Sequence, residues 1–79
     1  AVPYLAGARD ALAAGFVSGG TRRNLDWVRP HLHSAVGEDE LLLLADAQTS
    51  GGLLLAGEIE SAQLIGEFVE RGPDVLVIR

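Results

Sequence analysis

The sequence predicts an α+β domain in which helices come first and a small mixed or antiparallel sheet follows them. Apolar residues recur at helical spacing only in the first half of the chain. Short apolar runs bounded by turn residues dominate the last third. Helices followed by strands, without regular alternation, are typical of the α+β class. With 79 residues, the chain is long enough for one small domain at most.

Composition excludes several classes of function. The net charge of −5 argues against nucleic-acid binding, which needs a basic face. All six basic residues are arginines, so the chain has neither a phosphate-binding nor a Schiff-base lysine. No apolar run approaches the length of about 20 residues that spans a membrane. The absence of cysteine fits a reducing compartment, and we expect a cytoplasmic protein.

The first element that the sequence predicts is a helix over residues 4–14. Pro3 suits the first turn of a helix, and Gly15 suits the position just after its end. Gly7 would lie inside this helix, where glycine costs about 1 kcal/mol relative to alanine. The chain begins without an initiator methionine or a basic signal segment, which indicates a piece of a longer protein.

A glycine-rich loop is expected next, over Ser18-Gly19-Gly20-Thr21-Arg22-Arg23-Asn24. Its backbone N–H groups could form a concave anion site, with Arg22 and Arg23 supplying bidentate donors for phosphate. The alternative is a solvated turn in which Thr21 caps a short helix over residues 24–28. Pro30 is expected to push Arg29 out of the α region and to end that helix.

The middle of the chain predicts a surface loop and a third helix. His31 and His33 lie two residues apart without strand character or a third ligand nearby, so we expect no metal site. Three carboxylates at residues 38–40 favour a helix start, and the apolar run that follows extends the predicted helix to residue 45. We interpret these carboxylates as a solvated helix start rather than a catalytic pair.

A second glycine pair, Gly51 and Gly52, ends the polar segment that begins at Asp46. Adjacent glycines are kept where φ must be positive or where another group approaches the backbone closely. From this segment alone, an ordinary helix-to-strand turn is the alternative to a ligand site. Strands are expected over residues 53–56, 63–69 and 75–78, with a turn before the last of them.

Together, two segments resemble the selenide, water dikinase (selenophosphate synthetase) family. They are Gly19-Gly20-Thr21-Arg22-Arg23-Asn24 and Asp46-Ala47-Gln48-Thr49-Ser50-Gly51-Gly52-Leu53-Leu54, in the family's order and spacing. Val2-Pro3-Tyr4-Leu5-Ala6-Gly7-Ala8 and Ile65-Gly66-Glu67 also resemble the family. The resemblance spans nearly the whole chain. One departure is residues 57–62, which are too few for the helix that the family carries there.

The resemblance implies a single partial domain over residues 1–79, the second half of the C-terminal domain of an aminoimidazole-ribonucleotide-synthetase-like enzyme. Within that superfamily, enzymes of the selenide, water dikinase family make selenophosphate from selenide, ATP and water, and release AMP and phosphate. The implied partners are the enzyme's own N-terminal domain, which binds most of the ATP and magnesium, and a second subunit of a homodimer. The family's catalytic cysteine or selenocysteine and its lysine belong to the N-terminal part, so we expect the isolated chain to be inactive.

The residues expected on the phosphate or substrate side are all polar residues or glycines from the two motifs: Thr21, Arg22, Arg23, Asn24, Asp46, Gln48, Thr49, Ser50, Gly51 and Gly52. Two alternatives remain open from the sequence. One is the same domain in a related ATP-dependent synthetase or hydrogenase-maturation protein, and the other is a non-catalytic interaction module. The sequence preceding Ala1 in the complete protein would separate these hypotheses.

Overall fold

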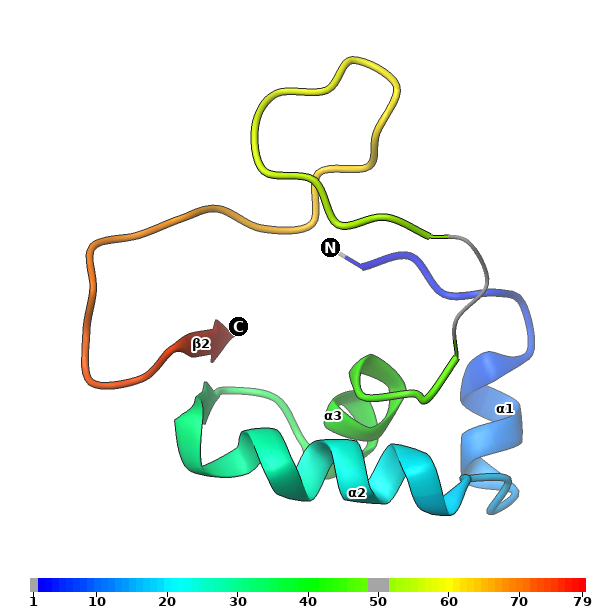
Figure 1. Cartoon of the computed structure of the whole chain (residues 1–79). Coiled ribbons are helices and arrows are strands. Elements are labelled where there is room, and N and C mark those ends of the chain that lie inside the picture. Colours follow the sequence, from blue (N-terminus) through cyan, green and yellow to red (C-terminus); the bar gives the residue numbers. More distant parts are fainter. Residues whose placement is uncertain (1, 49–51) are drawn as a thin grey trace.

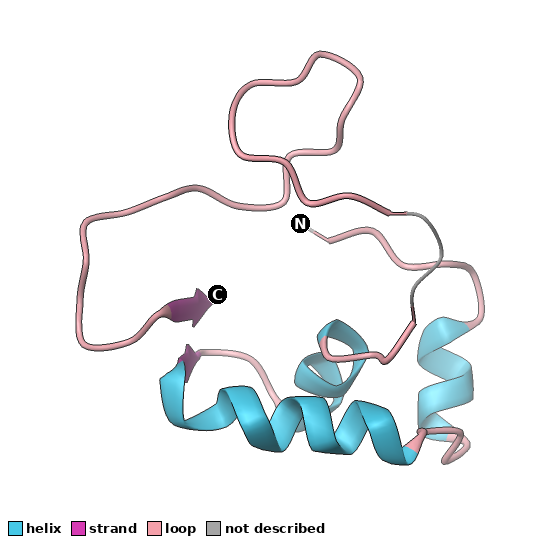
Figure 2. Cartoon of the chain, viewed as in Figure 1, coloured by secondary structure: helices cyan, strands magenta, loops and turns pink. Residues whose placement is uncertain are grey.

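The computed structural model describes residues 2–48 and 52–79. Three helices pack against one another in the first part of the chain, and a long loop then returns the chain to a short parallel sheet (Figure 1). Figure 2 shows that helix dominates one side of the molecule and loop the other. In chain order the elements are α1 (Ala8–Ala13), α2 (Gly19–Val28), the 3₁₀ helix η1 (Arg29–His31), β1 (Leu32–Ser34), α3 (Glu38–Leu44) and β2 (Leu76–Ile78).

Helix α1 begins later than the sequence predicts. Gly7 is its N-cap and has φ 87°, so this residue stands before the helix rather than inside it. The Ala8 N–H donates to the Leu5 carbonyl at 3.1 Å and closes a turn that holds Gly7 in this conformation. Pro3 therefore lies outside the helix. The correction follows from glycine's access to positive φ, which helix propensity alone does not take into account.

The end of α1 confirms the expectation for Gly15. This residue has φ 89° and follows the C-cap Ala14. Its N–H donates to the Leu12 carbonyl at 2.9 Å, and the Phe16 N–H donates to the Ala11 carbonyl at 3.0 Å. This pair of bonds is the Schellman arrangement, which satisfies the last carbonyls of a helix.

Helix α2 corrects the expectation of a glycine-rich loop, because Gly19 and Gly20 form its first turn. Ser18 is the N-cap, and its side-chain oxygen accepts the Thr21 N–H at 3.1 Å, so the alternative in which Thr21 caps a short helix is also wrong. A Cβ on Gly20 would stand 3.0 Å from the Ala47 Cβ. A glycine is therefore tolerated in the helix because another segment approaches closely at this position.

The chain leaves α2 without the break that Pro30 predicted. Arg29 has φ −50° and ψ −41°, within the α region, and the chain continues as η1. β1 follows directly and includes His33, so the expectation of a plain loop around the two histidines was also wrong. The structure thus tolerates Pro30 as the second residue of a tight helical turn, where its missing N–H breaks no bond.

The sheet has two strands, and they run parallel instead of antiparallel. β1 pairs with β2 in the register Leu32↔Leu76, His33↔Val77 and Ser34↔Ile78. β2 confirms the expected last strand. The strands expected over residues 53–56 and 63–69 are loop in the structure, because no strand within residues 2–48 and 52–79 pairs with either segment.

A small core holds the helices together. Leu25 of α2 and Leu41 and Leu42 of α3 are buried, so the predicted third helix is confirmed and faces the core with its leucines. Partly buried residues surround them: Leu12, Val17, Val28, Leu32, Val36, Ala45 and Ile78. This core ties α1, α2, α3 and the sheet to one another, and it positions the two motifs.

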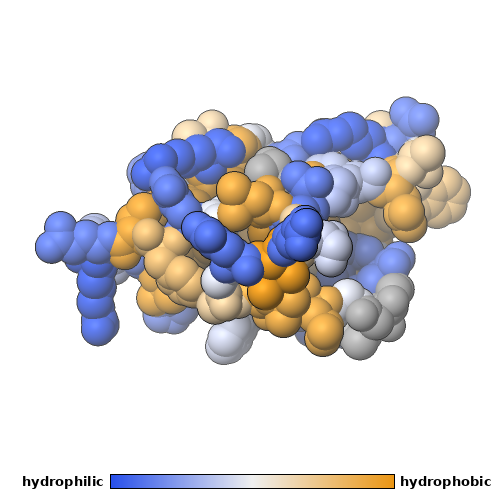
Figure 3. Space-filling model, turned by 90° about the horizontal axis from the view of Figure 1, so that it is seen from above, coloured by the Kyte–Doolittle hydropathy of each residue, from blue (hydrophilic) through white to orange (hydrophobic). Residues whose placement is uncertain are grey.

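The chain exposes more surface than a compact domain of its size. Its accessible surface is 6756 Å², whereas a folded monomer of this mass exposes about 4,600 Å². Its radius of gyration is 13.5 Å, against about 11.6 Å for a compact chain of this length. Leu53, Leu54 and Phe68 are each more than 80% exposed. Hydrophobic side chains are visible on the face seen in Figure 3.

Among the described residues, no helix is both long enough and apolar enough to cross a membrane.

Candidate functional site

A buried hydroxyl joins the two motifs. Thr21 in α2 is only 2% exposed, and its Oγ1 lies 2.9 Å from Asp46 Oδ1. The Ala47 N–H donates to the same Oγ1 at 3.2 Å. Helix α2 and the loop that follows α3 (Figure 1) therefore meet at the Thr21 side chain, although Thr21 and Asp46 are 25 residues apart in the sequence.

The chemistry of the groups fixes the direction of each hydrogen bond. An ionised carboxylate only accepts, so the single Thr21 hydroxyl proton goes to Asp46. Thr21 Oγ1 then accepts from Ala47 and from Ser18, whose Oγ lies 3.0 Å away. One donated and two accepted bonds saturate the hydroxyl. A saturated, buried hydroxyl holds its neighbours more firmly than an exposed one.

A second bond from α2 supports the same segment. The side chain of Asn24 donates through Nδ2 to the Ala45 carbonyl at 3.1 Å. Asn24 lies about one helical turn beyond Thr21, so both residues point toward the chain that leaves α3. The structure thus brings together three of the residues predicted from the sequence, namely Thr21, Asn24 and Asp46.

Among the described residues, the two arginines of the first motif make no hydrogen bond to Thr21 or Asp46. Arg23 is exposed, and its Nη1 lies 3.2 Å from the point where a Cβ of Gly19 would stand, so its guanidinium covers the first turn of α2. Arg22 is also exposed, and its positive charge contributes to the low pKa of Glu38, after the larger effect of the Arg29 hydrogen bond. Ligand contact by either arginine stays a prediction.

The second motif is described only in part. Gln48 is exposed in the loop after α3, whereas Thr49, Ser50 and Gly51 lie outside the described residues. Among the described residues, nothing lies within 4 Å of where a Cβ of Gly52 would stand. Gly51 lies outside the described residues, so the expectation of positive φ or close approach at this glycine pair stays a prediction. In the first motif it is Gly20 that meets a close neighbour.

A hollow of about 400 Å³ opens between α2, α3 and β2. Leu25, Leu44 and Ile78 line it, while Asn24 and Asp46 supply polar groups. Burying a phosphate against aliphatic side chains would be costly. The aliphatic part of this hollow is therefore unsuited to a phosphate.

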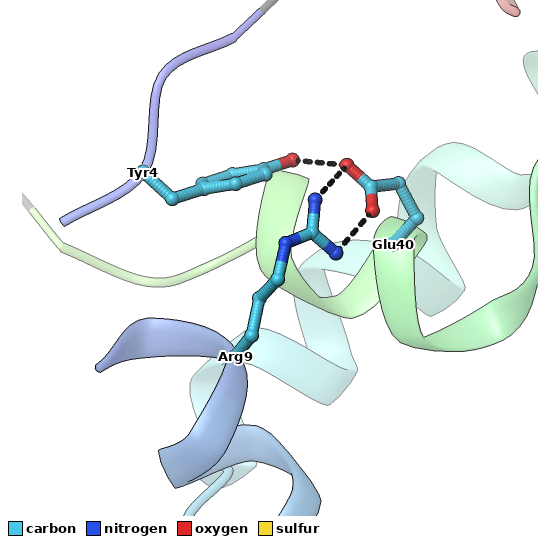
Figure 4. Close-up of polar contacts among 3 residues, drawn as sticks. All are labelled: Tyr4, Arg9 and Glu40. Atoms are coloured by element: carbon cyan, nitrogen blue, oxygen red, sulfur yellow. Dashed lines mark hydrogen bonds and ion pairs between the residues drawn. The ribbon is translucent and has the colours of Figure 1, made fainter. Parts of the chain in front are cut away.

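A second polar network was missed from the sequence. Glu40 in the first turn of α3 accepts hydrogen bonds on both of its carboxylate oxygens (Figure 4). Arg9 of α1 donates through Nη1 to Oε2 at 2.8 Å and through Nη2 to Oε1 at 3.2 Å. Tyr4 donates its hydroxyl to Oε1 at 2.9 Å, and Arg9 lies over the Tyr4 ring, 5.1 Å from its centre.

Ionisation within this network follows from the contacts. Hydrogen bonds from Arg9 and then Tyr4 hold the pKa of Glu40 below its usual value. Burial, followed by the bond to Glu40, raises the pKa of Tyr4. At neutral pH, Glu40 is therefore ionised and Tyr4 keeps the proton that it donates. The sequence offered opposite charges on two predicted helices, but nothing that pairs Arg9 with Glu40.

Comparison with known proteins gives relatives that share one name. The chain is 53% identical over 55 residues to a selenide, water dikinase from Photobacterium profundum, covering 70% of this chain and 16% of the relative. It is 50% identical over 66 residues to the selenide, water dikinase of Shewanella baltica, and the match covers 82% of this chain and 18% of the relative. For the selenide, water dikinase of Carboxydothermus hydrogenoformans, the identity is 36% over 74 residues, with 90% and 22% covered.

No family model matches the chain. No solved structure matches it either. All three of these relatives carry the name selenide, water dikinase. The chain is homologous to one segment of the selenide, water dikinase family, which confirms the resemblance that the two motifs indicated. It spans about a fifth of the length of the relatives that it matches.

Proposed function

We propose that this chain is a C-terminal part of a selenide, water dikinase, the enzyme that makes selenophosphate from selenide, ATP and water and releases AMP and phosphate. Its role in that enzyme is to shape the phosphate side of the active site. The carrying observation is the Thr21–Asp46 hydrogen bond, which joins the two motifs by which the chain resembles this family.

The residues of the chain suit phosphate handling better than bond-making. The chain contains no cysteine and no lysine, so the catalytic pair of the family must come from another part of the enzyme. The first turn of α2 presents backbone N–H groups, and Arg23 adds a guanidinium over that turn. Helix N-termini and arginine both favour bound phosphate. Asp46 and Asn24 would orient the loop that faces the phosphate.

ATP and magnesium would be held mainly by the N-terminal domain of the complete enzyme. Among the described residues, no group of three or more histidines and carboxylates lies close enough to hold a metal ion. The excess exposed apolar surface supports a large partner within the enzyme, because exposed leucines and phenylalanine of this kind are normally covered. We propose that the N-terminal domain and the missing part of the C-terminal domain cover them, within a cytoplasmic homodimer.

The purified 79-residue chain is expected to produce no AMP from ATP, with or without selenide. The reason is that the nucleophile and the lysine are absent from its sequence. The measurement is AMP formation by the chain, compared with the full-length protein and with a heat-denatured sample. AMP formed by the chain above the denatured control would contradict the proposed division of roles. A full-length protein that used ATP but did not require selenide would favour a related synthetase instead.

A further inference from the structure

We infer that the Tyr4–Arg9–Glu40 network positions the Asp46–Gln48 segment, acting through helix α3 from the opposite end of that helix. The coupling itself is independent of substrate, while its importance for catalysis rests on the proposed function. Among the described residues, Tyr4, Arg9 and Glu40 make no hydrogen bond to Asp46 or Ala47, so they would be positioning residues and not catalytic ones.

Helix α3 is a short, stiff connector between the two sets of contacts. It has seven residues, so it is about 10 Å long. Leu41 and Leu42 fix one of its faces in the core. A helix this short moves as a unit, because bending it would break several of its few backbone bonds. A displacement at the first turn is therefore carried to the last turn.

Side chains from other elements hold both ends of α3. At the start, Glu40 accepts three hydrogen bonds from Tyr4 and Arg9. At the end, the Ala45 carbonyl accepts from Asn24, and Asp46 accepts from Thr21. The bonds at the first end thus set the position from which the second end reaches Thr21.

The Tyr4–Arg9–Glu40 network restrains Glu40 through three hydrogen bonds. Exposed ion pairs contribute little, because water competes for both partners. The Glu40 side chain is only 28% exposed. Its carboxylate forms a bidentate pair with Arg9 and also accepts the Tyr4 hydroxyl (Figure 4). Paired donors of this kind fix orientation as well as distance. The network is therefore able to set the angle at which α3 begins.

The charged groups around α3 offer a matched control. Glu38 pairs with Arg29 at 3.0 Å, and this pair ties α3 to η1 rather than to α1. Asp39 lies between Glu38 and Glu40 in the same turn, and its side chain makes no hydrogen bond among the described residues. Replacing Asp39 removes the same charge from the same turn without touching the network.

The test is amide hydrogen exchange of the 79-residue chain by NMR, read at Ala47. The Ala47 N–H donates to Thr21 Oγ1, so its protection reports directly on the joined segments. Glu40→Gln is expected to lower this protection about threefold to tenfold relative to the amide of Leu25 in the core. Asp39→Asn is expected to leave the ratio unchanged. Normalising to Leu25 separates a local displacement from a loss of global stability.

Tyr4→Phe keeps the inference testable should Glu40→Gln fail to fold, because it removes a single hydrogen bond. It is expected to give a smaller change in the same direction. The inference is overturned by an Ala47-to-Leu25 ratio that is the same in both variants as in Asp39→Asn. It is equally overturned by an unprotected Ala47 amide in the unmodified chain. Neither result touches the proposed function, which is tested by AMP formation.

Discussion

Thr21→Val is expected to lower the free energy of unfolding by about 1–3 kcal/mol. Valine matches threonine in shape but has no hydroxyl, so the Ala47 N–H and one oxygen of Asp46 would lose their partner. Ser18 would lose one contact as well. Because Asp46 is exposed and water can replace part of its bond, the change should fall in the lower half of the range.

Thr21→Ser is the matched control, since it keeps the hydroxyl and removes only a methyl group. It is expected to cost about 1 kcal/mol, near the value of one buried methyl. Urea unfolding of both variants measures the difference. A valine variant as stable as the serine variant would show that the hydroxyl does not hold the two motifs together.

Arg23→Ala in the full-length enzyme is expected to lower kcat/KM for ATP about tenfold to a hundredfold. A charge-assisted hydrogen bond to phosphate is worth about 1.5–3 kcal/mol, and its loss gives that ratio. Arg23 is preferred to Arg22 because its guanidinium covers the first turn of α2. Arg23→Lys should restore activity only in part, because an ammonium group cannot reproduce the planar fork.

Arg22→Ala serves as the comparison in the same assay. Both arginines are exposed, so neither substitution should change stability by more than about 0.5 kcal/mol. Melting curves recorded beside the kinetics separate an effect on catalysis from an effect on folding. Wild-type kcat/KM in the Arg23→Ala variant would leave this turn with a structural role alone.

Local signals in the sequence were sufficient for several elements. The acidic start of α3 and the Gly15 cap of α1 depend on neighbours within one or two turns, and both expectations are confirmed. β2 is a compact run of branched residues after a turn, and it too is confirmed. The helix predicted at residues 24–28 is shorter than the observed α2, because two adjacent glycines predict a loop at residues 19 and 20. Their place in a helix depends on Ser18 nearby and on Ala47, which is distant in the sequence.

Contacts between distant residues explain what could not be predicted. The apolar runs at residues 53–56 and 63–69 have strand composition, but a strand also needs a partner, and the part of the chain that the structure describes supplies none. Thr21, Asn24 and Asp46 were selected by their motifs, yet nothing in the sequence states that Thr21 donates to Asp46 across 25 positions. Tyr4, Arg9 and Glu40 lie outside the two motifs, and their pairing becomes visible only where α1 and the segment before it pack against α3.

The account depends most on Thr21 and Asp46 acting as one unit. A double-mutant cycle with Thr21→Val and Asp46→Asn, measured as the rate of AMP formation by the full-length protein, tests this directly. We predict that the double variant is no slower than the slower single variant, so that the coupling between the two residues is at least about 1 kcal/mol. Effects that add to within about 0.5 kcal/mol would show that the two residues act independently, and would contradict a joined site.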